Sequence, residues 1–140
     1  MRTMRKPILV IDDSEFDAEL TLRALSQCFN NSPVVVAKSG EEAFAVLSDR
    51  TPHTVARQVG LILLDIKMPG ADGFELLNRL KANPTYAAIP VLIVTGSTII
   101  DDALRAQTLG AAGFISKQFD FSGFRSSLCS ALEPYCSSLL

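Results

Sequence analysis

Short apolar blocks separated by segments with helical periodicity place the strongest constraint on how this chain folds. The first, third and fourth blocks are continuously apolar and rich in Ile, Leu and Val, which is typical of parallel strands that are covered on both faces. The five blocks are residues 8–11, 34–37, 61–64, 91–94 and 113–115. We therefore predict five repeats of a strand followed by a helix.

The segments between the blocks carry helix signals. Ser39 and Glu42 have the spacing of a capping box at a helix start, and Pro134 is predicted to end or kink the last helix. Apolar residues at helical spacing follow the first block: Ala18, Leu22, Leu25 and Phe29.

Alternating strands and helices predict an α/β fold with a parallel sheet and right-handed crossovers. A chain of 140 residues with five such units fits a flavodoxin-like sheet of order 2-1-3-4-5 with helices on both faces, or a small Rossmann variant. We expect a single domain over residues 1–140, with a core from about residue 6 to 132 and a C-terminal tail over 133–140. Either sheet binds ligands beyond the carboxyl ends of its strands.

Composition narrows the class of protein. Hydrophobic residues make up 48% and charged residues 20% of the chain, which excludes intrinsic disorder. A net charge of −2 argues against a nucleic-acid partner. The longest apolar stretch, Ala87 to Val94, is far shorter than the ~20 residues of a membrane-spanning helix, and the N-terminus lacks the apolar region of a signal peptide. We expect a cytoplasmic protein with no membrane partner.

The cysteines and the single histidine suggest no chemistry of their own. The chain has an odd number of cysteines and no CxxC pair: Cys28, Cys129 and Cys136. We therefore expect neither a disulfide framework nor a metal knuckle, and we interpret the cysteines as small packing residues. His53 is the sole histidine, which argues against His-based metal clusters and Ser-His-Asp hydrolases.

Polar residues follow the apolar blocks where a ligand would bind. Asp12 and Asp13 follow the first block and Asp65 follows the third, while Thr95 and Lys117 follow the fourth and fifth. The order 2-1-3-4-5 places the first and third strands side by side, so the three carboxylates converge. Their repulsion costs on the order of 1–4 kcal/mol per pair at about 4 Å, and Mg²⁺ with oxygen ligands compensates for it.

A structural interpretation exists for each carboxylate alone. An Asp after a strand is commonly a turn former or a helix cap, and Asp12 and Asp13 stand directly before a predicted helix at Ser14. The combination of acids at two neighbouring strand ends with a hydroxyl and an ammonium on the same edge favours a functional site.

The residue types define the chemistry of such a site. A carboxylate beside Mg²⁺, here Asp65, is a nucleophile that forms an aspartyl phosphate. Lys117 offers a point charge for a phosphoryl oxygen, and Thr95 offers a hydroxyl. Lys67 and Ser97 are near enough in sequence to tune the lifetime of the phosphoryl group, although both also fit a solvated surface. We predict a phosphorylatable switch.

These motifs resemble the response-regulator receiver domain of two-component signalling. The resemblance spans roughly residues 6 to 132 and rests on four segments in order: 8–14, 63–73, 89–96 and 110–117. It implies that Asp65 is the phosphoacceptor. It also implies that Asp12, Asp13 and Asp65 hold Mg²⁺ together with the backbone carbonyl of Lys67.

The resemblance further implies that Thr95 and Lys117 contact the phosphoryl group. Phe114 stands where the family has an aromatic residue that swings inward as the threonine moves, although an ordinary core position is the alternative. The sequence departs from the family at Gln118, where receivers commonly carry proline after a cis bond. Because a non-proline cis bond costs about 3–4 kcal/mol, we expect a trans bond and a reshaped loop there.

The family implies partners and limits the alternatives. The phosphoryl donor is a sensor histidine kinase or a histidine phosphotransfer protein, and the domain catalyses only its own phosphorylation and dephosphorylation. We expect output through a downstream protein target or a homodimer, at a surface formed by the fourth helix, fifth strand and fifth helix. The alternatives are a phosphorelay intermediate and a receiver-like module that is not phosphorylated. Asp12 and Asp13 would repel a flavin phosphate, and Ser14 replaces the second Asp that an aspartyl phosphatase needs.

Overall fold

The central element is a five-stranded parallel sheet of order β2-β1-β3-β6-β7. The computed structural model describes residues 6–28, 32–48, 59–68, 71–96, 100–117 and 120–139. The strands are β1 (Ile8–Ile11), β2 (Val34–Ala37), β3 (Leu61–Leu64), β6 (Val91–Thr95) and β7 (Gly113–Ser116). This confirms the flavodoxin-like order, because the five sheet strands taken in chain order stand as 2-1-3-4-5.

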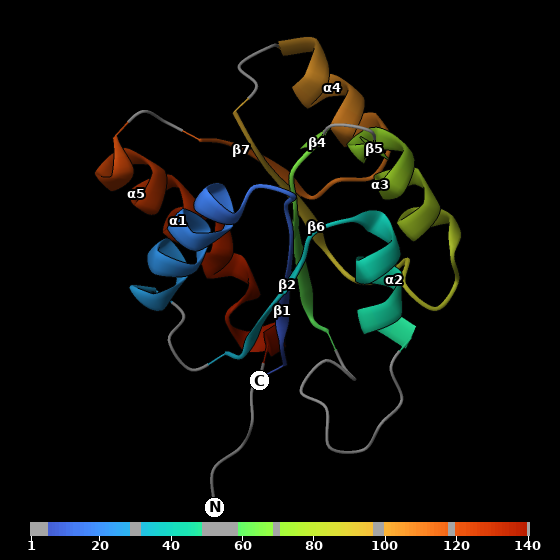
Figure 1. Cartoon of the computed structure of the whole chain (residues 1–140), viewed down its shortest axis with the longest axis horizontal. Helices are drawn as coiled ribbons and strands as arrows, with labels where there is room; N and C mark the ends of the chain where they lie inside the picture. Colours follow the sequence, from blue (N-terminus) through green and yellow to red (C-terminus); the bar gives the residue numbers. More distant parts are fainter. Residues whose placement is uncertain are drawn as a thin grey trace, which may run out of the picture.

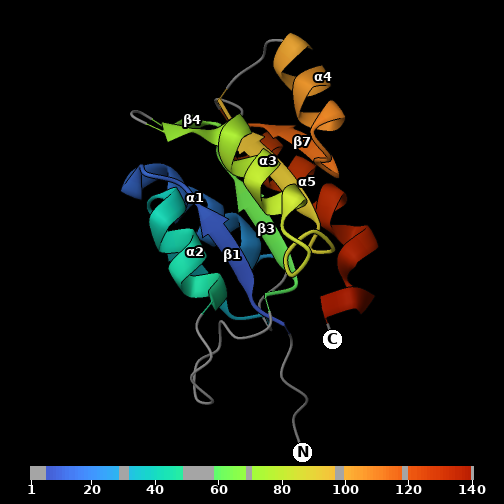
Figure 2. The ribbon, with the colours of Figure 1, turned by 90° about the vertical axis from the view of Figure 1, so that its right-hand side faces the viewer.

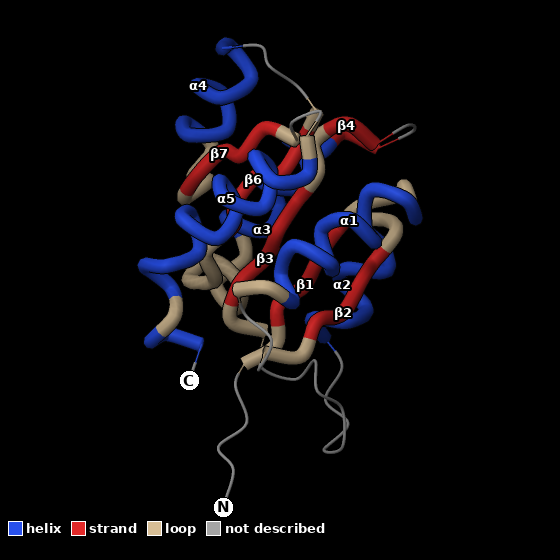
Figure 3. Tube along the Cα trace, turned by 90° about the vertical axis from the view of Figure 1, so that its left-hand side faces the viewer, coloured by secondary structure: helices blue, strands red, loops and turns tan. Residues whose placement is uncertain are grey.

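Helices cover both faces of the sheet. Figure 1 shows α1 and α5 on one face and α2, α3 and α4 on the other. Figure 2 views the sheet from the side of α2, α3 and α4, and Figure 3 views it from the side of α1 and α5. The helices are α1 (Glu15–Ser26), α2 (Gly40–Ser48), α3 (Gly73–Ala82), α4 (Ile100–Thr108) and α5 (Phe121–Leu132).

The two helical layers explain why the strands are continuously apolar. Side chains alternate between the faces of a strand. Accordingly, Ile8 and Val10 of β1 pack into the cluster that contains Leu25 and Leu128 of the first layer. Leu9 and Ile11 instead join the opposite cluster, under α2, α3 and α4. Every residue of β1 is therefore buried.

Local caps position the helix starts. Ser14 accepts a hydrogen bond from the Asp17 N–H at 3.2 Å and caps α1. Ser39 accepts from the Glu42 N–H at 3.1 Å, as predicted. The Glu42 carboxylate accepts from the Lys38 N–H, so the capping box is closed one residue earlier than in its usual form.

A short antiparallel ladder between β3 and α3 was not predicted. It joins β4 (Lys67–Met68) to β5 (Ala71–Asp72), two strands too short to show periodicity. Gly73 follows and begins α3, and a Cβ atom there would overlap the Cα atom of Ile66. The start of α3 therefore packs directly on the backbone that follows Asp65.

The C-terminal residues pack on the molecule's own core. After α5 ends at Leu132, Pro134 lies in the 3-10 turn Glu133–Tyr135, in agreement with the predicted helix end. Leu139 is fully buried among the residues of the α1 and α5 layer, and its carbonyl accepts a hydrogen bond from the Lys6 N–H at 2.6 Å. The packed core thus reaches past the expected limit near residue 132.

The prediction that the cysteines are simple packing residues is wrong for two of them. Cys28 and Cys129 form a disulfide with a Cα–Cα distance of 5.7 Å. Their separation of 101 residues conceals the pairing, because only the packing of α1 against α5 on the same face of the sheet brings them together. Cys136 is exposed and free.

Reduction is expected to destabilise the protein, because a cross-link that closes a loop of this length stabilises the fold by about 4–5 kcal/mol in the chain-entropy model. We expect dithiothreitol to lower the melting temperature of the oxidised protein by about 15 °C, measured by circular dichroism. The Cys28→Ala/Cys129→Ala variant should not respond to the reductant, and Cys136→Ser should behave as wild type. A wild-type melting temperature that is insensitive to reduction would contradict the pairing.

Candidate functional site

The register of the sheet places two buried carboxylates side by side. Ile11 of β1 pairs with Leu64 of β3, so the next residues, Asp12 and Asp65, leave the sheet at the same level. Both are buried, with exposed fractions of 3% and 5%. The Asp65 N–H donates to the Ile11 carbonyl at 3.0 Å, which extends the β1–β3 pairing into the site.

The ammonium of Lys117 lies among these carboxylates. Lys117 follows β7, and its N–H donates to the carbonyl of Thr95 at 2.7 Å. Its Nζ atom lies 2.8 Å from Asp12 Oδ2, 3.2 Å from Asp65 Oδ2 and 3.1 Å from Asp17 Oδ2. An ammonium has three donors, and these contacts use all of them.

Asp17 is the acidic residue that sequence reasoning missed. It lies in the first turn of α1, and its carboxylate oxygen lies within 4.8 Å of oxygens of Asp12 and Asp65. Asp13, which was expected in the pocket, is exposed and is not among the three acids that cluster in the described part of the chain. A signal was available, because Asp17 is one helical turn beyond Asp13 on a helix that starts at the predicted site.

Burial and hydrogen bonding shift the pKa values of two groups in the pocket, Asp12 and Lys117. Burial raises the pKa of Asp12 above its usual value, against hydrogen bonds from Lys117 and the Ser14 N–H that lower it. Burial alone would lower the pKa of Lys117, but the hydrogen bond to Asp12 and the charge of Asp65 outweigh it and raise that pKa. Lys117 is therefore charged, and its single positive charge faces three carboxylates.

The donor set fits a hard divalent cation. Three carboxylates face a single ammonium, and Mg²⁺ favours a few carboxylate oxygens together with water. The Lys67 N–H donates a hydrogen bond to Asp65 Oδ1 at 2.9 Å and orients this carboxylate. Lys67 itself is exposed. Asp12 and Asp65 are thus the buried acids that could hold such an ion, and the carboxylate of Asp17 lies beside them.

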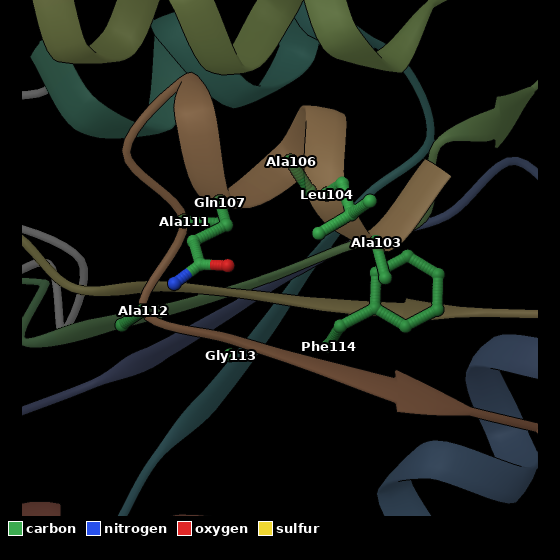
Figure 4. Close-up of a pocket in the computed structure, with 8 residues that line it drawn as sticks. All are labelled: Ala103, Leu104, Ala106, Gln107, Ala111, Ala112, Gly113 and Phe114. Atoms are coloured by element: carbon green, nitrogen blue, oxygen red, sulfur yellow. The ribbon is translucent and has the colours of Figure 1, made fainter. Parts of the chain in front are cut away.

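Thr95 and Phe114 lie on the side of the site nearest α4. Thr95 is fully buried at the end of β6, and Gly96 after it is exposed. Phe114 is half-buried on β7 and lines a cavity of about 290 Å³ together with α4 residues that include Leu104 and Ala106. In Figure 4 its ring extends from β7 toward α4. The predicted residues Ser97 and Gln118 lie outside the described residues.

Several large apolar side chains near this edge of the sheet are exposed. Ile100 and Leu104 of α4 are 75% and 55% exposed, and Phe16 at the start of α1 is 71% exposed. None of the helices in the described part of the chain combines the length and the apolar character that spanning a membrane requires.

Comparison with known proteins relates this site to one family. The chain matches the model of the response regulator receiver domain over residues 8–128. Response regulator Rcp1 of Synechocystis sp. is 30% identical over 112 residues, which cover 80% of this chain and 76% of Rcp1. Transcriptional regulatory protein MalR of Bacillus subtilis is 31% identical over 86% of this chain, which spans only 48% of MalR.

Solved structures agree with this relationship. The crystal structure of the phosphorylated cyanobacterial phytochrome response regulator RcpA has a TM-score of 0.82 and 29% identity, with 97% of both chains covered. The Mn²⁺-bound form of response regulator Rcp1 has a TM-score of 0.80 and 25% identity over 96% of this chain and 97% of that one. The sheet order, the acidic pocket and the match over residues 8–128 together show that this chain belongs to the response regulator receiver domain family.

Proposed function

We propose that the protein is a signalling switch in which Asp65 accepts a phosphoryl group from the phosphohistidine of a sensor histidine kinase or a histidine phosphotransfer protein. The observation that carries the proposal is the convergence of Asp12, Asp65 and Lys117 at the carboxyl edge of the sheet. Receiver domains are phosphorylated by such donors, and the relative RcpA has been crystallised in its phosphorylated form.

The transfer is a displacement at phosphorus. A carboxylate oxygen of Asp65 forms the new P–O bond while the P–N bond of the donor breaks, and the imidazole leaves with the electron pair of that bond. Lys117 then donates a hydrogen bond to a phosphoryl oxygen instead of to Asp65. Hydrolysis reverses the modification, because water attacks phosphorus, the P–O bond breaks and inorganic phosphate leaves.

We propose that the carboxylates of Asp12, Asp13 and Asp65, with the backbone carbonyl of Lys67, hold Mg²⁺. When bound, this ion supplies positive charge that offsets the negative charge of the phosphoryl oxygens. Asp12 and Asp65 are buried, and their backbone N–H groups are hydrogen-bonded to neighbouring strands, which fixes the positions of their carboxylates. Asp13 is exposed and would approach the ion from the solvent side.

The response to phosphorylation is proposed to pass through Thr95 and Phe114. The Thr95 hydroxyl would bind the phosphoryl group, and the cavity beside Phe114 provides space into which the aromatic ring can move. Exposed Ile100 and Leu104 on α4 give this side of the molecule an apolar surface for a downstream protein or a second copy of the chain. Output would then depend on how phosphorylation repacks α4 against β7.

We further propose that residues 1–140 act as one domain in the cytoplasm. Leu139 supports this extent, because it is buried in the same cluster as Ile8 at the start of β1. A reducing compartment would keep Cys28 and Cys129 as two thiols, so the disulfide would form only when the protein meets oxidising conditions.

Acetyl phosphate with Mg²⁺ is expected to add one phosphoryl group to the wild-type protein, measured by intact mass. Asp65→Asn should gain none because it lacks the nucleophile, and a chelator should abolish the gain. Asp101→Asn, at an exposed acid of α4, is the matched control and should be modified like wild type. A gain that persists in Asp65→Asn, or no gain from acetyl phosphate and from phosphohistidine donors, would overturn the proposed function.

Lys67→Ala is expected to shorten the lifetime of the phosphoryl group several-fold, because the exposed side chain beside Asp65 would otherwise shield it from water. The N–H that orients Asp65 belongs to the backbone and is retained, so the effect isolates the side chain. The decay of phosphorylated protein would be followed by intact mass, with Lys38→Ala as control. Equal decay rates in Lys67→Ala and wild type would remove the idea.

A further inference from the structure

Asp17 lies in the first turn of α1, where both its N–H and its carbonyl are hydrogen-bonded. Its N–H donates to the Ser14 side chain at 3.2 Å, and its carbonyl accepts from Thr21 Oγ1 at 3.1 Å. Its side chain is 37% exposed, and Oδ2 lies 3.1 Å from the Lys117 Nζ atom. The residue is thus supported from both sides while its carboxylate points into the pocket.

The three carboxylates that accept hydrogen bonds from Lys117 differ in the other interactions that each must make. The Asp65 carboxylate must give an oxygen to the incoming phosphoryl group. Asp12 already accepts from the Ser14 N–H through Oδ1 at 3.0 Å, and it is also the expected cation ligand. Within the described part of the chain, the only side chain to which the Asp17 carboxylate is bonded is Lys117. The hydrogen bond between Asp17 and the ammonium can therefore persist throughout the reaction, because the Asp17 carboxylate has no other role in it.

We propose that Asp17 is a positioning residue that anchors the Lys117 ammonium throughout phosphoryl acceptance; this rests on the proposed function of Asp65 and Lys117. When the phosphoryl group bonds to Asp65, one N–H of Lys117 moves from Asp65 to a phosphoryl oxygen, while another N–H stays on Asp17. The anchor is useful because a lysine side chain has many rotamers, and ordering them costs free energy.

A competing explanation is that Asp17 acts only as a nearby negative charge that attracts cations. The two explanations differ in whether the effect of Asp17 depends on Lys117. Asp17→Asn keeps the size of the side chain but replaces the charge-assisted hydrogen bond to the ammonium with a weaker neutral one. Glu19→Gln makes the same change of charge on the same helix at an exposed acid that pairs with Arg23 outside the pocket.

The first test observes the ammonium itself in metal-free protein. In ¹⁵N-lysine-labelled protein, a hydrogen-bonded Lys117 should give an ammonium resonance with slow proton exchange, assigned by its loss in Lys117→Arg. We expect Asp17→Asn to raise the exchange rate several-fold, because the charge-assisted hydrogen bond is weakened, and Glu19→Gln to leave it unchanged. An unchanged exchange rate in Asp17→Asn would overturn the anchor. Asp17→Ser provides a second variant if the first is poorly folded by circular dichroism.

The second test is a double-mutant cycle on the rate of phosphoryl gain from acetyl phosphate. Asp17→Asn should slow the reaction by about tenfold, the lower end of what a residue that orients a site ligand contributes. In a Lys117→Ala background the same change should have less than about a twofold effect. Equal slowing in both backgrounds, or equal slowing by Glu19→Gln, would overturn the proposal. No phosphoryl gain by wild type would instead overturn the proposed function, and the exchange measurement would still decide whether Asp17 anchors Lys117.

Discussion

The hydrogen bonds between one ammonium and three carboxylates are the interaction on which the site depends. Lys117 Nζ lies within 3.2 Å of oxygens from Asp12, Asp17 and Asp65, which come from the ends of β1 and β3 and the first turn of α1. A cation in this position makes it possible to bury Asp12 and Asp65, because buried carboxylates without a partner are strongly unfavourable. One positive charge against three negative ones leaves the pocket suited to a second cation, whose charge would also offset that of an incoming phosphoryl group.

The rest of the fold holds these groups at one level. Parallel pairing of β1 with β3 brings Asp12 and Asp65 together. Parallel pairing of β6 with β7 places Thr95 beside the end of β7, directly before Lys117. Gly73 allows α3 to start against the backbone that follows Asp65. At the opposite end of the sheet, the hydrogen bond between Lys6 and Leu139 joins the two ends of the described chain. Rigid strands therefore carry the site, while the side chains beside α4 border a cavity and retain room to move.

Much of this arrangement follows from local sequence patterns. The strand limits match the predicted blocks except for one added residue at the ends of β6 and β7, because apolar runs between polar residues mark buried strands clearly. The convergence of Asp12 and Asp65 follows from the sheet order alone. The disulfide of Cys28 with Cys129 and the burial of Leu139 depend on how α1, α5 and the C-terminal turn pack on the sheet. No local pattern encodes such contacts between residues far apart in the chain. The expectation that Asp13 helps to hold an ion came from its neighbour Asp12, and it stays a prediction, because the structure shows only that Asp13 is exposed beyond the end of β1.

The most direct test of the central claim is a titration of the metal-free protein with Mn²⁺, followed by electron paramagnetic resonance. If the Lys117 ammonium occupies the cation pocket, wild type should bind one ion per chain, and Lys117→Met should bind it several-fold more tightly because the competing charge is gone. Asp65→Asn should bind more weakly because a ligand has lost its charge. Equal affinities of Lys117→Met and wild type, or no specific ion in either, would contradict the account of a shared pocket.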